Sequence, residues 1–306
     1  MTDEFCSAKN ITTSNSLAPT GHPFSRFTAP SSIPHGSKLS DILNTQALEL
    51  IAESFSSVYP AFDTQEFVES CDGCFSDYSL MNKAQAIGQK ILEYLPNEQI
   101  EVVQILVDSF GPKLTQTEDN GLAGMIYLPH SSILASFADS EDLALVDAGI
   151  AACIELTSRF TSEFCIRPYI IHHREKTLGL LAKLTSHSDP HIRRLVSEGT
   201  RPRLPWGVHL QCVKKDPQLS IPLLECLKDD DSRYVTRSVA NHLGDIGKDH
   251  PSLLLSICQT WLEQTLVEGF DAQQAKERRW LIRHALRYPA KKGVEQALRI
   301  RSAAKD

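Results

Sequence analysis

The chain has 306 residues, 42% hydrophobic and 23% charged, which is typical of a soluble protein with a sizeable core and excludes a fibrous or disordered class. It has no run of about eighteen apolar residues, and its N-terminus lacks the basic and apolar regions of a signal peptide. We therefore expect a cytoplasmic monomer without membrane contact, whose eight cysteines are reduced.

The net charge of −7 is divided unevenly along the chain. Residues 1–150 hold 6 Lys and Arg against 20 Asp and Glu, a balance of −14, whereas residues 151–306 hold 25 against 18, a balance of +7. The second half is therefore the part that would face a polyanion such as DNA. The alternative is a solvated basic surface that binds no partner.

The chain begins with a segment of different composition from the rest. Residues 1–39 are rich in Ser, Thr and Pro and show no sustained apolar periodicity, so we predict a disordered tail. From residue 40 onwards the apolar residues recur with helical spacing, notably over 82–96, 100–110 and 142–159. Strand signals are sparse, so we predict an all-α domain over residues 40–306.

The second half of the chain contains internal repeats. Three segments can be superposed: SDPHIRRLVSEG (188–199), DSRYVTRSVANHLGD (231–245) and KERRWLIRHALRYPA (276–290). Aligning Arg194, Arg237 and Arg283 gives offsets of 43 and 46 residues, which are typical of HEAT-like helix pairs. A weaker fourth copy of the repeat lies upstream, where Glu163 aligns with Glu198 and Arg159 with Arg194. The repeats predict a curved α-solenoid with a concave surface.

Polar residues four apart lie on one face of a helix, so each repeat predicts a polar stripe. The stripes are Arg159/Glu163/Arg167, Arg194/Glu198, Arg237/Asn241/Asp245 and Arg279/Arg283/Arg287. In register they would form a row of arginines and carboxylates across the stack. The alternative is a set of surface salt bridges, each worth at most about 1 kcal/mol.

The segment GTRPRLPWG (199–207) separates two of the predicted helices. Its prolines favour extended backbone, and the loop would present the guanidinium groups of Arg201 and Arg203 followed by the indole of Trp206. Arginine forks bind phosphate and an indole stacks on bases, so the loop has the chemistry of a nucleic-acid contact. The alternative for Trp206 is a core position between helices.

The C-terminal region adds a basic helix. Its cations are Arg278, Arg279, Arg283, Arg287, Lys291 and Lys292. This helix would contact DNA phosphates without reading sequence, or would be a solvated amphipathic helix with no partner.

Four segments resemble, in order and spacing, the motif blocks of AlkC-type bacterial DNA alkylation-repair glycosylases, which are relatives of the AlkD type. They are SEFCIRPYI (162–170), HIRRLVSEGTRPRLPWG (191–207), RSVANHLGDIGKDHP (237–251) and RWLIRHALRYPAKKG (279–293). The strong blocks cover residues 155–300; earlier residues match only in helical pattern. The resemblance implies a HEAT-like fold. It also leads us to expect that the immunoglobulin-like domain carried by many such proteins is absent.

The resemblance further implies a monofunctional glycosylase that excises 3-methyladenine and 3-methylcytosine from double-stranded DNA. By motif, Glu163 and Glu198 match the active-site carboxylates, and Asp245 matches a nearby acidic position. Phe164, Arg194 and Trp206 match positions that line the lesion site. We also expect DNA contacts from the arginines and the asparagine of the stripes and the loop: Arg167, Arg201, Arg203, Arg237, Asn241, Arg283 and Arg287.

These residues suit the chemistry of base excision. A base methylated at N3 is cationic and leaves without a general acid, so catalysis reduces to stabilising an oxocarbenium-like sugar and placing a water molecule. A carboxylate serves both purposes. We assign the main role to Glu198, with Glu163 sharing it, and expect Arg194, one turn earlier, to keep Glu198 ionised.

Other chemistry has little support in the sequence. Cys71 and Cys74 form a lone Cys-x-x-Cys pair without the second pair of a zinc site, and no Gly-rich phosphate loop occurs. We therefore predict no metal and no cofactor. The alternative function is a catalytically silent HEAT-like module that binds damaged or branched DNA or a protein partner.

Overall fold

The computed structural model describes residues 21–29, 33, 35–118 and 120–305, and these residues form helices and turns without a strand. The helices of the first half are α1 (Thr45–Val58), α2 (Thr64–Cys71), α3 (Leu80–Glu93), α4 (Gln99–Asp108), α5 (Leu128–Ser136) and α6 (Leu143–Thr157). The next are α7 (Glu163–His172), α8 (Arg174–Lys183), α9 (Pro190–Gly199), α10 (Gln211–Lys215) and α11 (Ile221–Leu227). The last are α12 (Arg233–Asp249), α13 (Pro251–Gln264), α14 (Ala272–Ala285), α15 (Arg287–Lys291) and α16 (Glu295–Ala303). The predicted all-α class is confirmed.

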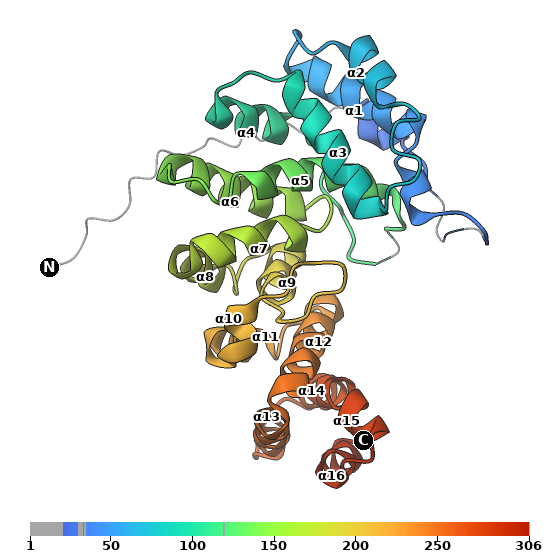
Figure 1. Cartoon of the computed structure of the whole chain (residues 1–306). Coiled ribbons are helices and arrows are strands. Elements are labelled where there is room, and N and C mark those ends of the chain that lie inside the picture. The colour runs from blue at the N-terminus through green and yellow to red at the C-terminus, as the bar shows by residue number, and fades with distance from the viewer. Residues whose placement is uncertain (1–20, 30–32, 34, 119, 306) are drawn as a thin grey trace, which may run out of the picture.

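The helices stack as a curved solenoid (Figure 1). One layer consists of α3, α5, α7, α9, α12 and α14, each of which packs on the next. The second layer includes α4, which packs on α6, and α13, which packs on α16. Each helix pair thus buries its apolar faces against its neighbours, as in a HEAT-like repeat. Within the described part of the chain, no helix has both the length and the apolar character needed to cross a membrane.

Side-chain caps fix where many of these helices begin. An Asn, Asp or Ser side chain accepts a hydrogen bond from a backbone N–H of the first turn, which that turn cannot satisfy internally. Such caps start α1, α2, α3, α6, α9 and α14, at Asn44, Asp63, Ser79, Asp142, Asp189 and Asp271. The cap at Asp189 and Pro190 in the first turn begin the helix that carries Glu198.

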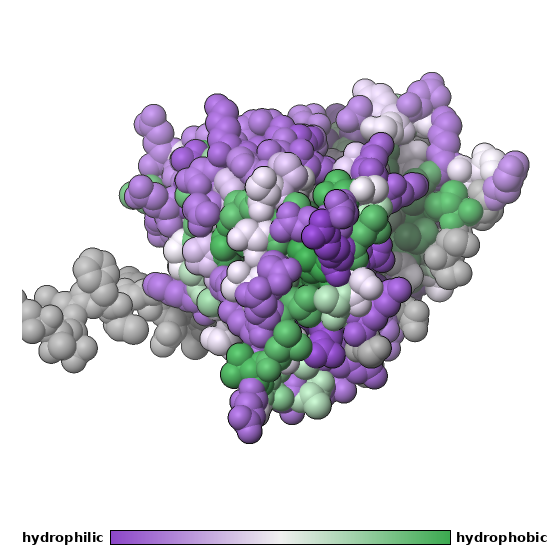
Figure 2. Space-filling model, turned by 90° about the horizontal axis from the view of Figure 1, so that it is seen from below, coloured by the Kyte–Doolittle hydropathy of each residue, from purple (hydrophilic) through white to green (hydrophobic). Residues whose placement is uncertain are grey.

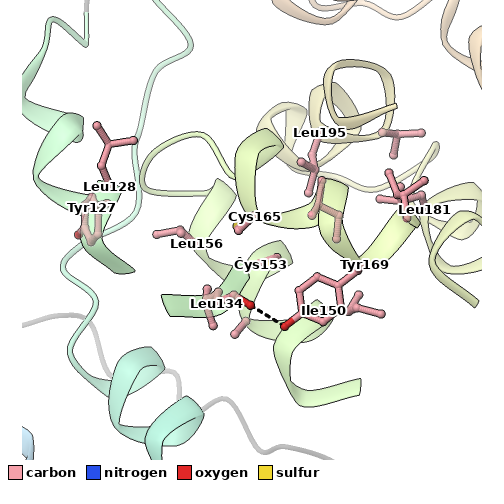
Figure 3. Packing of buried hydrophobic residues seen from close by; sticks show 14 of the residues in the cluster. Tyr127, Leu128, Leu134, Ile150, Cys153, Leu156, Cys165, Tyr169, Leu181 and Leu195 are labelled. Atoms are coloured by element: carbon pink, nitrogen blue, oxygen red, sulfur yellow. Dashed lines mark hydrogen bonds between the residues drawn. The ribbon is translucent and has the colours of Figure 1, made fainter. Parts of the chain in front are cut away.

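A buried tyrosine ties three helices of the core together (Figure 3). Tyr169 of α7 is fully buried, and its hydroxyl donates to the carbonyl of Leu134 in α5 at 2.8 Å. Gly149 of α6 leaves the space that this ring occupies, because a Cβ there would collide with the tyrosine hydroxyl. The position of α7, and therefore of Glu163 at its start, is set by this close packing.

The N-terminal boundary of the packed region lies earlier than the sequence predicted. Pro23–Arg26 form the short 3₁₀ helix η1, and Phe24 and Phe27 belong to the core cluster. The Phe24 ring lies 4.8 Å from the ring of Tyr127. The prediction of a disordered tail is therefore wrong for these residues, because two phenylalanines bury enough apolar surface to order the segment. The rest of that prediction, residues 1–20, lies outside the described residues.

The repeats largely coincide with the observed helices. The segments 188–199 and 231–245 contain α9 and the first part of α12, and 276–290 spans α14 and α15. The weaker fourth copy is wrong, because α6 ends at Thr157 and α7 begins only at Glu163. Arg159 lies in the intervening turn and donates to the Gly111 carbonyl at 2.5 Å. It therefore shares no helix face with Glu163.

The end of the stack that carries the last helices is mostly hydrophilic, with an apolar strip among the polar side chains (Figure 2). Exposed apolar residues of this part of the chain are Leu266, Val267, Tyr288, Val294 and Leu298. The last helices thus keep part of their apolar surface uncovered.

Candidate active site and nucleic-acid surface

Two glutamates from successive helices of the first layer meet at one cavity. Glu163 is the first residue of α7 and Glu198 lies in the last turn of α9, and these helices pack on each other. Both side chains are largely buried, with 6% of each residue exposed. Both nevertheless line a cavity of about 260 Å³ whose wall also contains Phe160, Phe164 and Trp206. The fold thus brings together residues that the chain separates by 35 positions.

Arg194 lies between the two carboxylates. Its Nη1 is 3.4 Å from Oε2 of Glu163, and its Nη2 is 3.6 Å from Oε1 of Glu198. Nη1 also donates to the hydroxyl of Thr161 at 2.8 Å. The guanidinium stands 5.0 Å from the centre of the Tyr234 ring, in a cation–π arrangement. One arginine therefore holds both carboxylates and is itself held from a third helix, α12.

Glu198 is fully engaged by its neighbours. Oε1 accepts a hydrogen bond from Nη1 of Arg201 at 2.6 Å, and Oε2 accepts one from the Ser238 hydroxyl at 2.6 Å. Burial on its own would raise the pKa of Glu198, but Arg194, Arg201 and the Ser238 hydrogen bond together lower it below its usual value. Glu198 is therefore ionised and fixed in place.

Glu163 has a different environment. Arg194 is the cation that contacts its carboxylate among the described residues. Burial raises the pKa of Glu163, the negative charge of Glu198 raises it further, and Arg194 offsets only part of this effect. The two carboxyl groups thus have pKa values displaced in opposite directions. Such a divergence is typical of paired acids that have separate tasks in a site.

Arg201 lines the cavity and belongs to a buried ion network in its wall. It is 8% exposed, and besides Glu198 it binds Asp245, with Nη2 2.7 Å from Oδ2. Lys248 approaches the other oxygen of Asp245 at 2.8 Å. Two buried carboxylates thus occupy the Arg201 guanidinium in this structure, and its predicted contact with phosphate stays a prediction. Asp245 in turn supports Arg201 and does not line the cavity.

Arg167 is also internal. Its side chain is fully buried, and it donates to the backbone carbonyls of Gly199, Arg201 and Val208 at 2.6 to 3.0 Å. The expected DNA contact by Arg167 is therefore wrong. Its contacts instead fix the shape of the loop that carries Trp206, and burial lowers its pKa to about 10.

Trp206 stands at the edge of the cavity. It is 69% exposed, so the alternative of a core position is wrong. Its φ is 61°, a left-handed conformation that is uncommon outside glycine and that clusters at functional positions. Arg203 of the same loop is partly exposed and pairs with Asp249, with Nη2 2.7 Å from Oδ1.

A second cavity of about 500 Å³ adjoins the first, since Met81, Leu128, Phe164 and Trp206 line both. Its wall includes uncharged polar residues of α3, among them Gln85 and Gln89. The wall residues from α3 and α5 could not be predicted from the sequence, because that half of the chain shows only a general helical periodicity. Phe160 was missed for a different reason, because it lies in the turn between α6 and α7 and belongs to no helical stripe.

Polar residues of α12, α14 and α15 form a basic face beside the site. Nη2 of Arg287 donates to Oδ1 of Asn241 at 2.9 Å, and Nε2 of His284 lies 3.1 Å from the same oxygen. Arg237 of α12 is exposed and pairs with Glu118 at 3.0 Å. Arg283 differs from the predicted stripe, because it donates to the Ala304 carbonyl after α16 and does not join this face.

The described residues contain no cluster of three His, Cys, Asp or Glu side chains able to hold a metal ion. Cys71 of the Cys-x-x-Cys pair is buried in the core and Cys74 is exposed. Burial raises the pKa of Cys71 to about 11, so this thiol stays protonated.

No protein-family profile matches the chain, but comparison with known proteins finds similar ones. The uncharacterized protein YhaZ of Bacillus subtilis (strain 168) is 32% identical over 261 residues, which are 85% of this chain and 67% of YhaZ. The alkylpurine DNA glycosylase AlkC of Pseudomonas fluorescens, solved bound to DNA containing an abasic-site analog, is 31% identical. Its structure matches with a TM-score of 0.72 over 88% of this chain and 68% of AlkC. With this identity and coverage, the chain belongs to the AlkC family of DNA glycosylases.

Proposed function

We propose that the chain is a DNA-repair glycosylase that hydrolyses the N-glycosidic bond of cationic N3-methylated bases, 3-methyladenine and 3-methylcytosine. The observation that carries this proposal is the pair of carboxylates, Glu163 and Glu198, on one arginine at an aromatic-lined cavity. The DNA bound to the similar P. fluorescens glycosylase supports DNA as the partner.

The wall of the cavity suits a cationic base. Phe160, Phe164 and Trp206 offer aromatic rings, whose faces attract cations, and Glu163 adds a carboxylate. A neutral base would gain stacking but neither of these charge contributions. The site therefore favours a base whose methylation has made it positively charged.

The same charge makes the base a good leaving group. When the bond breaks, its electron pair moves to the base, which becomes neutral, and the positive charge develops on the sugar. A carboxylate near the sugar stabilises this oxocarbenium-like state and accepts a proton from the attacking water. No general acid is required.

The contacts favour Glu163 for this role, whereas the sequence-based interpretation gave the main part to Glu198. The oxygens of Glu198 are occupied by Arg201 and Ser238, so this carboxylate has little capacity for a new ligand. Among the described residues Glu163 forms an ion pair with Arg194 alone, and like Glu198 it lines the cavity. In this proposal Glu163 acts on the sugar and the water, and Glu198 is a positioning residue that orients Arg194.

The test is release of 3-methylcytosine from a duplex, measured as abasic sites after cleavage at those sites. We expect Glu163→Gln to slow single-turnover release by about 10²- to 10⁴-fold, the contribution typical of a positioned acid–base group. The matched control is Glu175→Gln, since Glu175 lies in the first turn of the next helix, is exposed and has no ion-pair partner in the described residues. This control removes the same charge from an equivalent helix position and should leave release unchanged.

Binding to a duplex with an abasic-site analog completes the assay. Glu163→Gln protein that binds this duplex normally and still releases the base at the wild-type rate would refute the role of Glu163. Wild-type protein that binds the duplex but releases neither methylated base would point to the silent DNA-binding module.

A further inference from the structure

The long connection between α4 and α5 runs across the stack to the basic face (Figure 1). Two hydrogen bonds, one between backbone groups and one from the Arg159 side chain, hold its first part against the turn after α6. The N–H of Leu114 donates to the Ser158 carbonyl at 2.8 Å, and the Gly111 carbonyl accepts from Arg159. The connection is thus anchored on the turn between α6 and α7 before Glu118 reaches α12.

Glu118 of this connection pairs with Arg237 of α12. The carboxylate and the guanidinium are 3.0 Å apart, although the residues are 119 positions apart in the chain. Both side chains are exposed, at 64% and 47%, so water screens the pair and its contribution is small. A stronger anion is therefore able to replace the Glu118 carboxylate.

The surface around Arg237 has an excess of positive charge. Arg287 has no carboxylate within ion-pair distance among the described residues, and it is held through Asn241. Arg233 stands over the Trp280 ring at 3.7 Å and pairs with Glu277, so within the described part of the chain the unpaired cation of this surface is Arg287. The Trp280 ring also stacks on His284. Burial and the three arginines, Arg287, Arg237 and Arg233, lower the pKa of His284 to about 4.

We propose that Arg237 and Arg287 form a subsite for a backbone phosphate of duplex DNA, and that Glu118 occupies the Arg237 part of this subsite in the free protein. Asn241 holds the Arg287 guanidinium, and the exposed fork of Arg237 suits a phosphate as well as a carboxylate. DNA then binds by displacing Glu118, and the carboxylate lowers affinity for every duplex without regard to sequence. This inference rests on the proposed function, since it presupposes that DNA is the ligand.

The experiment measures binding of fluorescent duplexes, one unmodified and one with an abasic-site analog, between about 50 and 200 mM salt. We expect Glu118→Gln to tighten binding of both duplexes about twofold to fivefold at low salt. Glu141→Gln is the matched control, because Glu141 is exposed, has no ion-pair partner in the described residues and loses the same charge. It should change affinity much less. Arg237→Gln should weaken binding and lower the salt slope by about one phosphate contact.

The double variant Glu118→Gln/Arg237→Gln separates the subsite from a general charge effect. If Glu118 acts through Arg237, Glu118→Gln should not tighten DNA binding any further in the Arg237→Gln background. An equal gain in both backgrounds, or an equal gain from Glu141→Gln, would overturn the proposal. If no variant binds either duplex, the proposed function itself fails. If wild-type protein binds and excises while Glu118→Gln changes nothing, only the subsite is refuted.

Discussion

Replacing Arg201 by glutamine tests the buried ion network in the cavity wall. The Arg201 side chain is 10% exposed and pairs with Glu198 at 2.6 Å and with Asp245 at 2.7 Å. Glutamine removes the charge and leaves two buried carboxylates without their shared partner. Breaking a buried pair in this way costs about 3–5 kcal/mol. Arg194 and Lys248 still contact these carboxylates, so we expect a loss of about 3 kcal/mol, a large fraction of a typical stability.

The assay is urea unfolding followed by far-ultraviolet circular dichroism, which reports the helices. Arg203→Gln is the matched control, because its partner Asp249 lies at the surface and its loss should change the unfolding midpoint only slightly. Adding Asp245→Asn to Arg201→Gln should restore part of the lost stability, since it removes one of the stranded charges.

The reasoning would be refuted if Arg201→Gln and Arg203→Gln had the same unfolding midpoint. If Arg201→Gln in addition reduced the salt dependence of DNA binding, Arg201 would contact phosphate, as the sequence first suggested. A loss of stability with an unchanged salt dependence would instead place its guanidinium within the protein.

Two further predictions concern stability. His130 and His242 are fully buried, and burial lowers their pKa values to about 3 and about 4. Since the unfolded chain binds protons near pH 6.5 and the native chain does not, stability should fall with pH below 6.5 by about 1 kcal/mol per unit for each histidine. Urea midpoints that stay constant from pH 7 to pH 5 would contradict this. Phe24→Ala should cost about 3 kcal/mol because it empties a core position, and an unchanged thermal midpoint would show that the N-terminal segment does not stabilise the fold.

The sequence predicted the second half of the fold well and its charged residues less well. The repeats at α9, α12 and α14 were visible because each helix has one apolar and one polar side. The same periodicity continued falsely through Arg159, because a turn between two helices can preserve the spacing of a helix. Glu163 and Glu198 were found through the motif blocks, not through the incorrect fourth repeat.

The roles of the arginines depended on contacts that a single sequence does not contain. Arg167, Arg201 and Arg203 all come from conspicuous basic motifs. In the structure Arg167 binds backbone carbonyls, Arg201 binds buried carboxylates, and Arg203 forms an ion pair at the surface. Which of these occurs depends on residues 32 to 46 positions away, such as Gly199, Asp245 and Asp249. Charge alone therefore predicts a basic region but not which cations meet solvent.

The contacts of Arg167 have a consequence for how the tryptophan loop tolerates change. The arginine grips main-chain oxygens only, and every amino acid supplies the same carbonyl. A change of side chain at the exposed Val208 therefore leaves this hydrogen bond in place, whereas Arg201 and Trp206 are constrained by contacts of their own. The backbone path of the loop depends in part on one side chain of α7, Arg167.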